Sequence, residues 1–166
     1  PSVSAYLQQR AKIKRSAFEE LFEATTNLDG QARHYHGYRL LAADGSDVQI
    51  PTNPKDRDTY FPGVNGQKPY NLIHLNALYD ILSNTYQDVV VQDRYRWAEQ
   101  AALSHMVDGS SIGNAIVIAD RGYESYNVMA HIQEKGWRYL IRVKDINGSG
   151  IVSRLDLPDA EEFDIC

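Results

Sequence analysis

The fold of this chain is decided by residues 115–125, which read Ala-Ile-Val-Ile-Ala-Asp-Arg-Gly-Tyr-Glu-Ser. The first five residues are apolar and partly β-branched, which predicts a strand buried on both faces. Gly122 permits a sharp exit from that strand, and Ser125 is a suitable cap for a following helix. Asp120 is therefore expected at the carboxyl end of a buried strand, where α/β sheets place their chemistry. The alternative is that Asp120 only ends the strand or caps the helix.

A second apolar stretch is also followed by an aspartate and a glycine. Residues 38–43, Tyr-Arg-Leu-Leu-Ala-Ala, predict a buried strand that runs into a turn at 44–47, Asp-Gly-Ser-Asp. Two more strands are predicted at 70–82 and 86–92, and Ser83-Asn84-Thr85 between them suits a hairpin. The first half of the chain thus predicts three consecutive strands.

Apolar residues recur at helical spacing in three stretches, 4–27, 93–107 and 125–135. Asp93 is the expected cap of the middle helix. A last strand is predicted at 138–144. The predicted buried stripe of the middle helix comprises Trp97, Ala98, Ala101, Ala102, His105 and Met106.

The predicted order of elements is helix, three strands, helix, strand, helix, strand. This order matches the ribonuclease-H-like fold, an α/β architecture whose mixed sheet has the strand order 3-2-1-4-5 and is flanked by helices. The first and fourth strands are neighbours in that sheet. Asp44 and Asp120 are therefore expected side by side, although 76 positions separate them in the sequence.

Two adjacent aspartates predict a cation site, because proteins tolerate close carboxylates when they share a proton or a cation. Oxygen ligands favour Mg²⁺ or Mn²⁺. Two such ions about 3.5–4 Å apart serve in-line displacement at phosphorus. The hypothesis is that Asp44 bridges two ions and that Asp120 completes the site. In the alternative, a plain α/β domain, both aspartates are turn residues.

Length and composition set the limits of this hypothesis. The 166 residues, 43% of them hydrophobic, suit one domain with a real core. The net charge of −5 argues against a nucleic-acid partner at first sight, but residues 145–166 hold six acidic side chains and one arginine, and the rest of the chain balances. No signal peptide and no membrane span are expected, because residues 1–15 are polar and basic and no apolar run approaches the ~20 residues of a span. Cys166 is the single cysteine, so a reducing cytoplasm is the expected location.

Three stretches resemble a known family. They are residues 38–46, 74–80 (His-Leu-Asn-Ala-Leu-Tyr-Asp) and 118–125 (Ile-Ala-Asp-Arg-Gly-Tyr-Glu-Ser). They are similar to the catalytic core of bacterial insertion-sequence transposases, and more closely to the "insertion sequence four" DDE family. The early residues 9–22 also resemble the family's segment before its first aspartate, so that the resemblance covers residues 4–145.

The resemblance implies a DNA transposase whose first two catalytic acids are Asp44 and Asp120. It implies two Mg²⁺ or Mn²⁺ ions, transposon ends and target DNA as partners, and a homodimer in the synaptic complex. The family's third acid lies in a Tyr-x₂-Arg-x₃-Glu-x₆-Lys signature, which this chain does not contain. The chain itself is therefore expected to be inactive or nearly so, while its parent cuts transposon ends and joins them to target DNA.

The expected strand ends also bring three cations near the aspartates. Arg121, Arg142 and Lys144 are candidates to hold DNA phosphates, with solvated surface charge as the alternative. The expected division of the chain is a helical segment at 1–30, the catalytic core at 31–145, and the acidic, loop-like start of an insertion at 146–166.

Other functions remain open on the sequence. A different nuclease of the same fold would need its third acid inside the chain, from Asp80, Asp88 or Glu99, and none of these is expected beside Asp44. A non-catalytic or truncated regulatory protein, which pairs with a full-length transposase or with DNA, is the other alternative.

Overall fold

The structure, a computed structural model, describes residues 2–10, 12–26, 32–93, 95, 97–158 and 160. The predicted turn at 27–30 and the acidic positions 159, 161, 162 and 164 lie outside the described residues. The helices are α1 (Val3–Arg10), α2 (Arg15–Thr26), α3 (Glu99–Gly109) and α4 (Tyr126–Glu134), with 3₁₀ turns η2 (Arg121–Tyr123) and η3 (Ile151–Arg154). The strands are β1 (Arg39–Ile50), β2 (Tyr60–Phe61), β3 (Tyr70–Asp80), β4 (Thr85–Gln92), β5 (Ala115–Ala119) and β6 (Arg138–Ile141).

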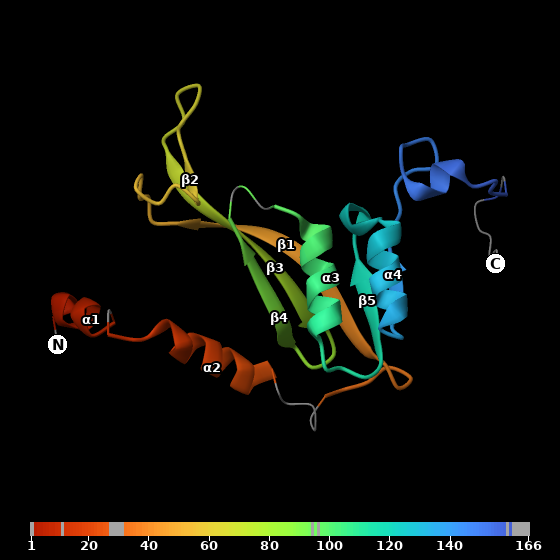
Figure 1. Cartoon of the computed structure of the whole chain (residues 1–166), viewed down its shortest axis with the longest axis horizontal. Coiled ribbons are helices and arrows are strands. Elements are labelled where there is room, and N and C mark those ends of the chain that lie inside the picture. The colour runs from red at the N-terminus through yellow and green to blue at the C-terminus, as the bar shows by residue number, and fades with distance from the viewer. Residues whose placement is uncertain are drawn as a thin grey trace.

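The strands form one mixed sheet in the order β2-β3-β1-β5-β6, and β4 pairs with β3 (Figure 1). β1 is antiparallel to β3, and β3 is antiparallel to β4. β1 is parallel to β5, and β5 is parallel to β6. Apart from the two-residue β2, the order β4-β3-β1-β5-β6 is the predicted 3-2-1-4-5. The ribonuclease-H-like mixed sheet is therefore confirmed.

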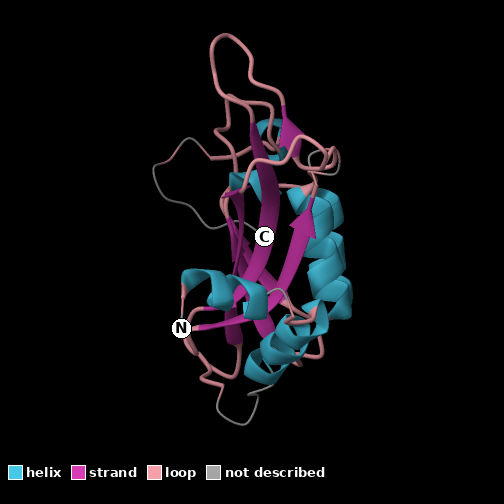
Figure 2. Cartoon of the chain, turned by 90° about the vertical axis from the view of Figure 1, so that its left-hand side faces the viewer, coloured by secondary structure: helices cyan, strands magenta, loops and turns pink. Residues whose placement is uncertain are grey.

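The hydrophobic core lies between the sheet and helices α3 and α4. Figure 1 shows both helices in front of the strands, and Figure 2 shows the strands from the side as one twisted layer. The core residues are Leu41, Ala43, Leu78, Leu103, Met106, Val107, Ala115, Val117, Ala119, Tyr123, Val128, Ile132 and Trp137. On the other face of β5, Ile116 and Ile118 are only half-buried. The predicted strand is correct, but its full burial on both faces is not, because α3 and α4 cover one face.

The N-terminal helix predicted at 4–27 is two helices. The amides of Lys12 and Ile13 bond to carbonyls three residues earlier, at 3.0 and 3.1 Å, so the chain leaves the α-helical pattern between α1 and α2. Helix α2 contacts the sheet at β4, and its apolar residues Phe18 and Leu21 remain exposed. In the described part of the chain, no helix is long and apolar enough to cross a membrane.

The turn predicted at 44–47 is wrong, because β1 continues through it to Ile50. Its antiparallel pairing with β3 runs without interruption from Leu41↔Asp80 to Ile50↔Asn71. The parallel pairing with β5 nevertheless stops at Ala43↔Ala119. Asp44 therefore lies inside a strand, at the level where its β5 neighbour ends.

The helix predicted to begin directly after Asp93 begins only at Glu99. Asp93 accepts a hydrogen bond from Tyr95 N at 2.8 Å, and Gln92 Oε1 accepts one from Ala98 N at 3.1 Å. These bonds hold the connection in a loop, and α3 starts at Glu99. The predicted buried stripe is consequently wrong for Trp97, Ala98, Ala101 and His105, which are exposed. The residues that α3 buries are Ala102, Leu103, Ser104, Met106 and Val107.

Candidate active site

Asp44 and Asp120 lie at the same level of the sheet, Asp44 within β1 and Asp120 directly after the parallel strand β5. Each directly follows a residue of the pair Ala43↔Ala119, the last pair of the β1–β5 ladder. Both aspartates are exposed, whereas the two alanines are buried. The apolar residues before the aspartates thus anchor the strands in the core, and the carboxylates emerge where that core ends.

Backbone N–H groups orient both carboxylates. Asp120 caps η2, and its Oδ1 accepts a hydrogen bond from Gly122 N at 2.7 Å. Oδ1 of Asp44 accepts one from Gly45 N at 2.9 Å. Among the described residues, neither carboxylate pairs with a lysine or arginine, and the second oxygen of each accepts no hydrogen bond. These open oxygens are available to a ligand.

The first turn of α3 brings a third carboxylate to the region around Asp44 and Asp120, called the aspartate edge below. A Cβ placed on Gly45 would lie 2.6 Å from Glu99 Oε1, and one placed on Gly122 would lie 3.5 Å from Glu99 Oε2. Gln100 Nε2 donates to the carbonyl of Gly122 at 2.9 Å, which ties the same turn to the loop after β5. Glu99 thus lies over Gly45, the residue after Asp44, where the sequence did not place it, because α3 begins at Glu99 rather than at residue 93.

His74 of β3 lies against Glu99 and was missed by the sequence reasoning. Its Nδ1 is 2.7 Å from Asp47 Oδ1, and its Nε2 is 3.2 Å from Glu99 Oε1. The Trp97 ring packs beside the imidazole, with centroids 5.3 Å apart. A cavity of about 400 Å³ opens here, lined by His74, Trp97, Ala98, Glu99, Gln100 and Gly122. The useful sequence signal was the alternation of β3, which places His74 and Asn76 on the face of Leu78.

Negative charge at the aspartate edge contributes to the raised pKa of the buried Tyr123 phenol. Burial raises the pKa of Tyr123 well above its ordinary value of 10, and the carboxylates of Glu99, Asp44 and Asp120 raise this pKa further. Three carboxylates thus act on one buried group. Tyr123 remains a neutral phenol, and an opposite charge at this edge would relieve the repulsion among the carboxylates.

The donor set fits a divalent cation in part. Exposed carboxylate oxygens are the ligands that Mg²⁺ and Mn²⁺ prefer, and Asp44 and Asp120 each keep one oxygen open. In the part of the chain that the structure describes, no group of three or more His, Cys, Asp or Glu side chains is arranged to hold a metal ion. The two aspartates are therefore part of a cation site rather than a complete one.

The three cations predicted to bind DNA surround one cavity beside Asp120. Arg121, Arg142 and Lys144 line a space of about 620 Å³, together with Val143, Asp145, Ile146, Val152, Leu155 and Leu157. Arg142 N donates to Ala119 O at 3.0 Å, which holds the chain after β6 close to the end of β5. The topology thus brings these cations to the aspartate edge, as expected.

Glu124 anchors the segment that carries two of these cations. Its buried carboxylate accepts hydrogen bonds from Lys144 N, at 2.8 Å, and from Ile151 N. The bond from the Lys144 amide is the main cause that lowers the pKa of Glu124. Gly150 packs so closely that a Cβ there would lie 2.5 Å from Glu124 Oε1. Glu124 is therefore a link between the loop after β5 and residues 144–151.

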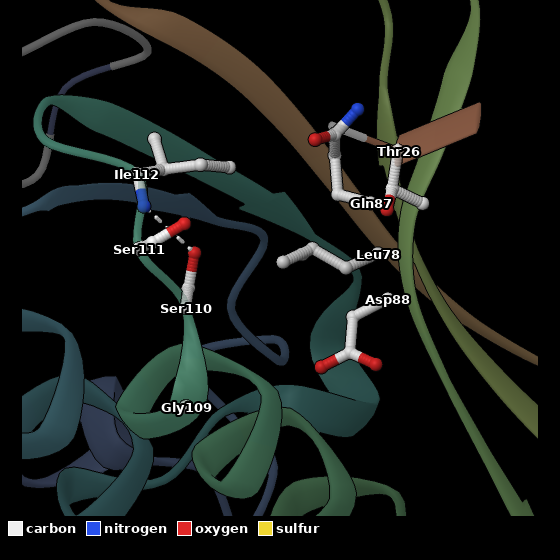
Figure 3. Close-up of a pocket in the computed structure, with 8 residues that line it drawn as sticks. All are labelled: Thr26, Leu78, Gln87, Asp88, Gly109, Ser110, Ser111 and Ile112. Atoms are coloured by element: carbon white, nitrogen blue, oxygen red, sulfur yellow. Dashed lines mark hydrogen bonds between the residues drawn. The ribbon is translucent and has the colours of Figure 1, made fainter. Parts of the chain in front are cut away.

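The remaining acids considered for the site serve elsewhere. Asp80 is fully buried and accepts hydrogen bonds from Arg39 Nε at 2.7 Å and from two backbone amides. Asp88 lines a cavity of about 140 Å³ near the C-terminal end of α3, with Ser110, Ser111 and Leu78 among its neighbours (Figure 3). The expectation that neither Asp80 nor Asp88 serves the aspartate edge agrees with these positions.

A comparison with models of protein families matches residues 35–153 to the family described as the transposase DDE domain. The match spans more than two thirds of the 166 residues and includes Asp44, Asp120 and the three cations. No curated protein matches the chain.

Proposed function

Because the chain belongs to the transposase DDE domain family, we propose that Asp44 and Asp120 are catalytic acids of a protein that cleaves and joins DNA. The observation that carries this proposal is the last pair of the β1–β5 ladder, Ala43↔Ala119, which precedes both aspartates. Within the family we favour the "insertion sequence four" branch, because residues 120–125 read Asp-Arg-Gly-Tyr-Glu-Ser.

Asp44 and Asp120 would hold Mg²⁺ or Mn²⁺ through the carboxylate oxygens that accept no hydrogen bond. Two such ions, when bound, activate the attacking oxygen and stabilise the leaving oxygen of an in-line displacement. The amides of Gly45 and Gly122 keep the two carboxylates oriented. Tyr123 stays neutral beside them and adds no negative charge.

The reaction would proceed in two displacements at phosphorus. Water first breaks the phosphodiester bond at a transposon end and frees a 3′-hydroxyl group. That hydroxyl then attacks target DNA, so that one phosphodiester bond forms as another breaks. Neither step needs a covalent bond to the protein.

Arg121, Arg142 and Lys144 would bind the phosphates of transposon-end or target DNA, since all three line one cavity beside Asp120. By analogy with the family, two copies would meet in the synaptic complex. The cytoplasm, at the nucleoid, is the location that such a substrate requires.

We also propose a division of the chain into a helical segment at 1–30, a catalytic core at 31–145 and the start of an insertion at 146–166. No Tyr-x₂-Arg-x₃-Glu-x₆-Lys segment occurs among the 166 residues. The core would therefore lack its third acid, and we expect this chain by itself to cleave DNA weakly or not at all.

Strand transfer by the full-length parent tests the catalytic role of Asp120. Asp120→Asn should abolish strand transfer and leave the melting temperature nearly unchanged, because the amide oxygen still caps η2. Glu134→Gln, an exposed position at the end of α4, is the matched control and should transfer strands normally. Normal activity of Asp120→Asn contradicts the proposal, and loss of folding would instead favour a structural role.

DNA binding by this chain tests the cations. In a salt titration with a duplex, Arg142→Ala and Lys144→Ala should each lower the slope of log Kd against log salt by about 0.9. Arg138→Ala changes an exposed arginine at the opposite end of β6 and should leave that slope unchanged. Equal slopes for all three variants contradict the DNA-binding role.

Glu99 supports a second candidate, a nuclease of the same fold with its third acid inside the chain. Glu99 lies over Gly45 and beside Gly122, so that it is a third carboxylate near the two aspartates. This candidate predicts strong Mn²⁺-dependent DNA cleavage by the 166-residue chain, lost in Glu99→Gln. An inactive chain excludes it and agrees with the first proposal.

A further inference from the structure

His74 and Glu99 place two potential metal-ligand atoms close together, apart from the carboxylates of Asp44 and Asp120. The imidazole is almost fully buried, with 7% of its residue surface exposed, and Nδ1 lies 2.7 Å from Asp47 Oδ1. When Nδ1 donates its hydrogen to Asp47, the neutral ring carries a lone pair on Nε2. An acceptor carboxylate on one ring nitrogen is the arrangement that orients histidine ligands of metal ions.

Nε2 of His74 has no hydrogen-bond partner among the described residues. It lies 3.2 Å from Glu99 Oε1, but the two atoms are not aligned for a hydrogen bond. Ligands at about 2.0–2.2 Å from one tetrahedral or octahedral ion stand about 3–3.5 Å apart. The separation of Nε2 and Oε1 is therefore that of two ligands on a single ion.

Gly45 leaves space at the point between these donors. A Cβ at residue 45 would lie 2.6 Å from Glu99 Oε1 and 2.7 Å from His74 Nε2, and any other residue would fill that point. Both donors thus face one small space that only a glycine keeps open. Glycine is not required there by the backbone, because Gly45 has no positive φ.

We infer that His74 Nε2 and Glu99 Oε1 bind a divalent transition-metal ion over Gly45, with Asp47 orienting the imidazole. Imidazole nitrogen suits Zn²⁺, Cu²⁺, Fe²⁺ and Ni²⁺, whereas Mg²⁺ and Mn²⁺ prefer oxygen ligands. The site is distinct from the one proposed for Asp44 and Asp120, although the two are neighbours. It does not depend on the proposed function, because it needs no DNA.

A cavity beside His74 gives the ion access to the site, and the carboxylates of Asp47 and Glu99 supply negative charge that the ion would neutralise. The cavity of about 400 Å³ beside His74 admits water or a phosphate oxygen to the remaining coordination positions. In the described part of the chain, neither Asp47 nor Glu99 pairs with a lysine or arginine. The packing of Trp97 against the imidazole shields one side of the site, so the ion would be held in a partly dry environment.

A second histidine provides a matched control. His131 Nδ1 lies 3.0 Å from Asp108 Oδ1, so it has the same histidine–aspartate pairing on the surface. No second carboxylate is paired with its ring among the described residues. His131→Gln therefore removes a comparable imidazole without affecting the inferred site.

Co²⁺ titration of the 166-residue chain without DNA, followed by visible absorption and calorimetry, tests the inference. The wild type should bind one Co²⁺ ion at this site, and Zn²⁺, but not millimolar Mg²⁺, should displace it. Glu99→Gln should weaken Co²⁺ binding at least about tenfold, and Asp47→Asn by about 10- to 100-fold. His131→Gln should bind Co²⁺ as the wild type does, and the pair Asp44→Asn with Asp120→Asn should keep the visible absorption of Co²⁺ bound at His74.

Two outcomes of the Co²⁺ titration overturn the inference. One is equal Co²⁺ affinity in Glu99→Gln and the wild type. The other is loss of Co²⁺ binding in the Asp44/Asp120 variant, which would assign Glu99 to the aspartate site instead. Since His74→Gln risks unfolding, the nitrogen NMR signals of the wild-type imidazoles provide a direct readout. Zn²⁺ should shift Nε2 of His74 and leave His131 unchanged, and an unmoved His74 signal also overturns the inference.

Discussion

The two aspartates follow similar sequences, but the chain behaves differently after each of them. After Asp44, β1 continues for six residues, because β3 pairs with it as far as Ile50. After Asp120, β5 has ended, and the carboxylate caps a 3₁₀ turn. An apolar run followed by Asp and Gly thus marks where a carboxylate emerges, while the neighbouring strand decides whether the chain turns there.

The two segments also differ in how they are held. Residues after Asp44 are fixed by a regular ladder of backbone hydrogen bonds with β3. Residues after Asp120 are fixed by side chains, because Gln100 bonds to Gly122 and Glu124 bonds to the amides of Lys144 and Ile151. Substitutions near the β1–β3 ladder and substitutions at the side chains that hold the Asp120 loop should therefore differ in their effects on stability.

The largest effect is expected from the start of the β1–β3 ladder. Asp80→Asn leaves Arg39 without the charge of its buried partner, which lies 2.7 Å away. Breaking a buried ion pair on one side costs about 3–5 kcal/mol of unfolding free energy, measurable by urea denaturation.

The control for Asp80→Asn is Glu19→Ala, which breaks the exposed pair between Arg15 and Glu19. Such a surface pair contributes about 0–1 kcal/mol. If both substitutions have similarly small effects, the buried pair does not support β1 as described.

A smaller effect is expected at the side-chain support of the Asp120 loop. Gly150→Ala places a Cβ 2.5 Å from Glu124 Oε1 and 2.8 Å from Lys144 Cβ, so the segment must shift. Overpacking of this kind costs about 1–3 kcal/mol, and proteolysis at Lys144 and Arg154 should become faster. Gly113→Ala meets no atom within 4 Å and should change neither measurement. Unchanged proteolysis of Gly150→Ala would show that Glu124 does not hold this segment.

The two aspartates themselves should differ by less. Asp120→Ala removes the cap of η2 and should lower the unfolding free energy by about 0.5–2 kcal/mol. Asp44→Ala removes only a bond to the next amide and relieves repulsion with nearby carboxylates, so its effect should be within about 0.5 kcal/mol. Urea denaturation at neutral pH measures the unfolding free energy of both variants. An equal loss of unfolding free energy in the two variants would contradict the stabilising role of the Asp120 cap.

The smallest effect is a pH dependence at Glu124, on the Asp120 side. Hydrogen bonds lower the pKa of Glu124 below 4.5 in the folded chain. The stabilisation by its carboxylate is therefore complete above pH 4.5 and is lost as pH falls through the lower folded pKa. The difference in melting temperature between the wild type and Glu124→Gln should shrink over that acidic range. A constant difference from pH 6 to pH 3 would mean that the carboxylate charge is not involved.

Local sequence signals were sufficient for most strands and for the candidate pair. The β-branched run of β5 and the hairpin between β3 and β4 follow from periodicity and turn residues, and both agree with the structure. The order of elements then predicted the sheet that makes Asp44 and Asp120 neighbours. Periodicity failed at Asp93, because the bonds from Tyr95 N to Asp93 and from Ala98 N to Gln92 favour a loop where a helix cap was predicted.

The sequence by itself therefore determined the order of the elements, the ribonuclease-H-like sheet and the pair Asp44 and Asp120, because each depends on local patterns and on simple rules of chain connection. Only the tertiary structure decided where α3 begins, that β1 continues past Asp44, and that His74, Glu99 and Gly45 meet. The last two features depend on contacts between residues far apart in the sequence, whereas the start of α3 depends on hydrogen bonds between a loop and the end of β4. No local pattern encodes such contacts, since each is formed only when β3, α3 and β1 pack together.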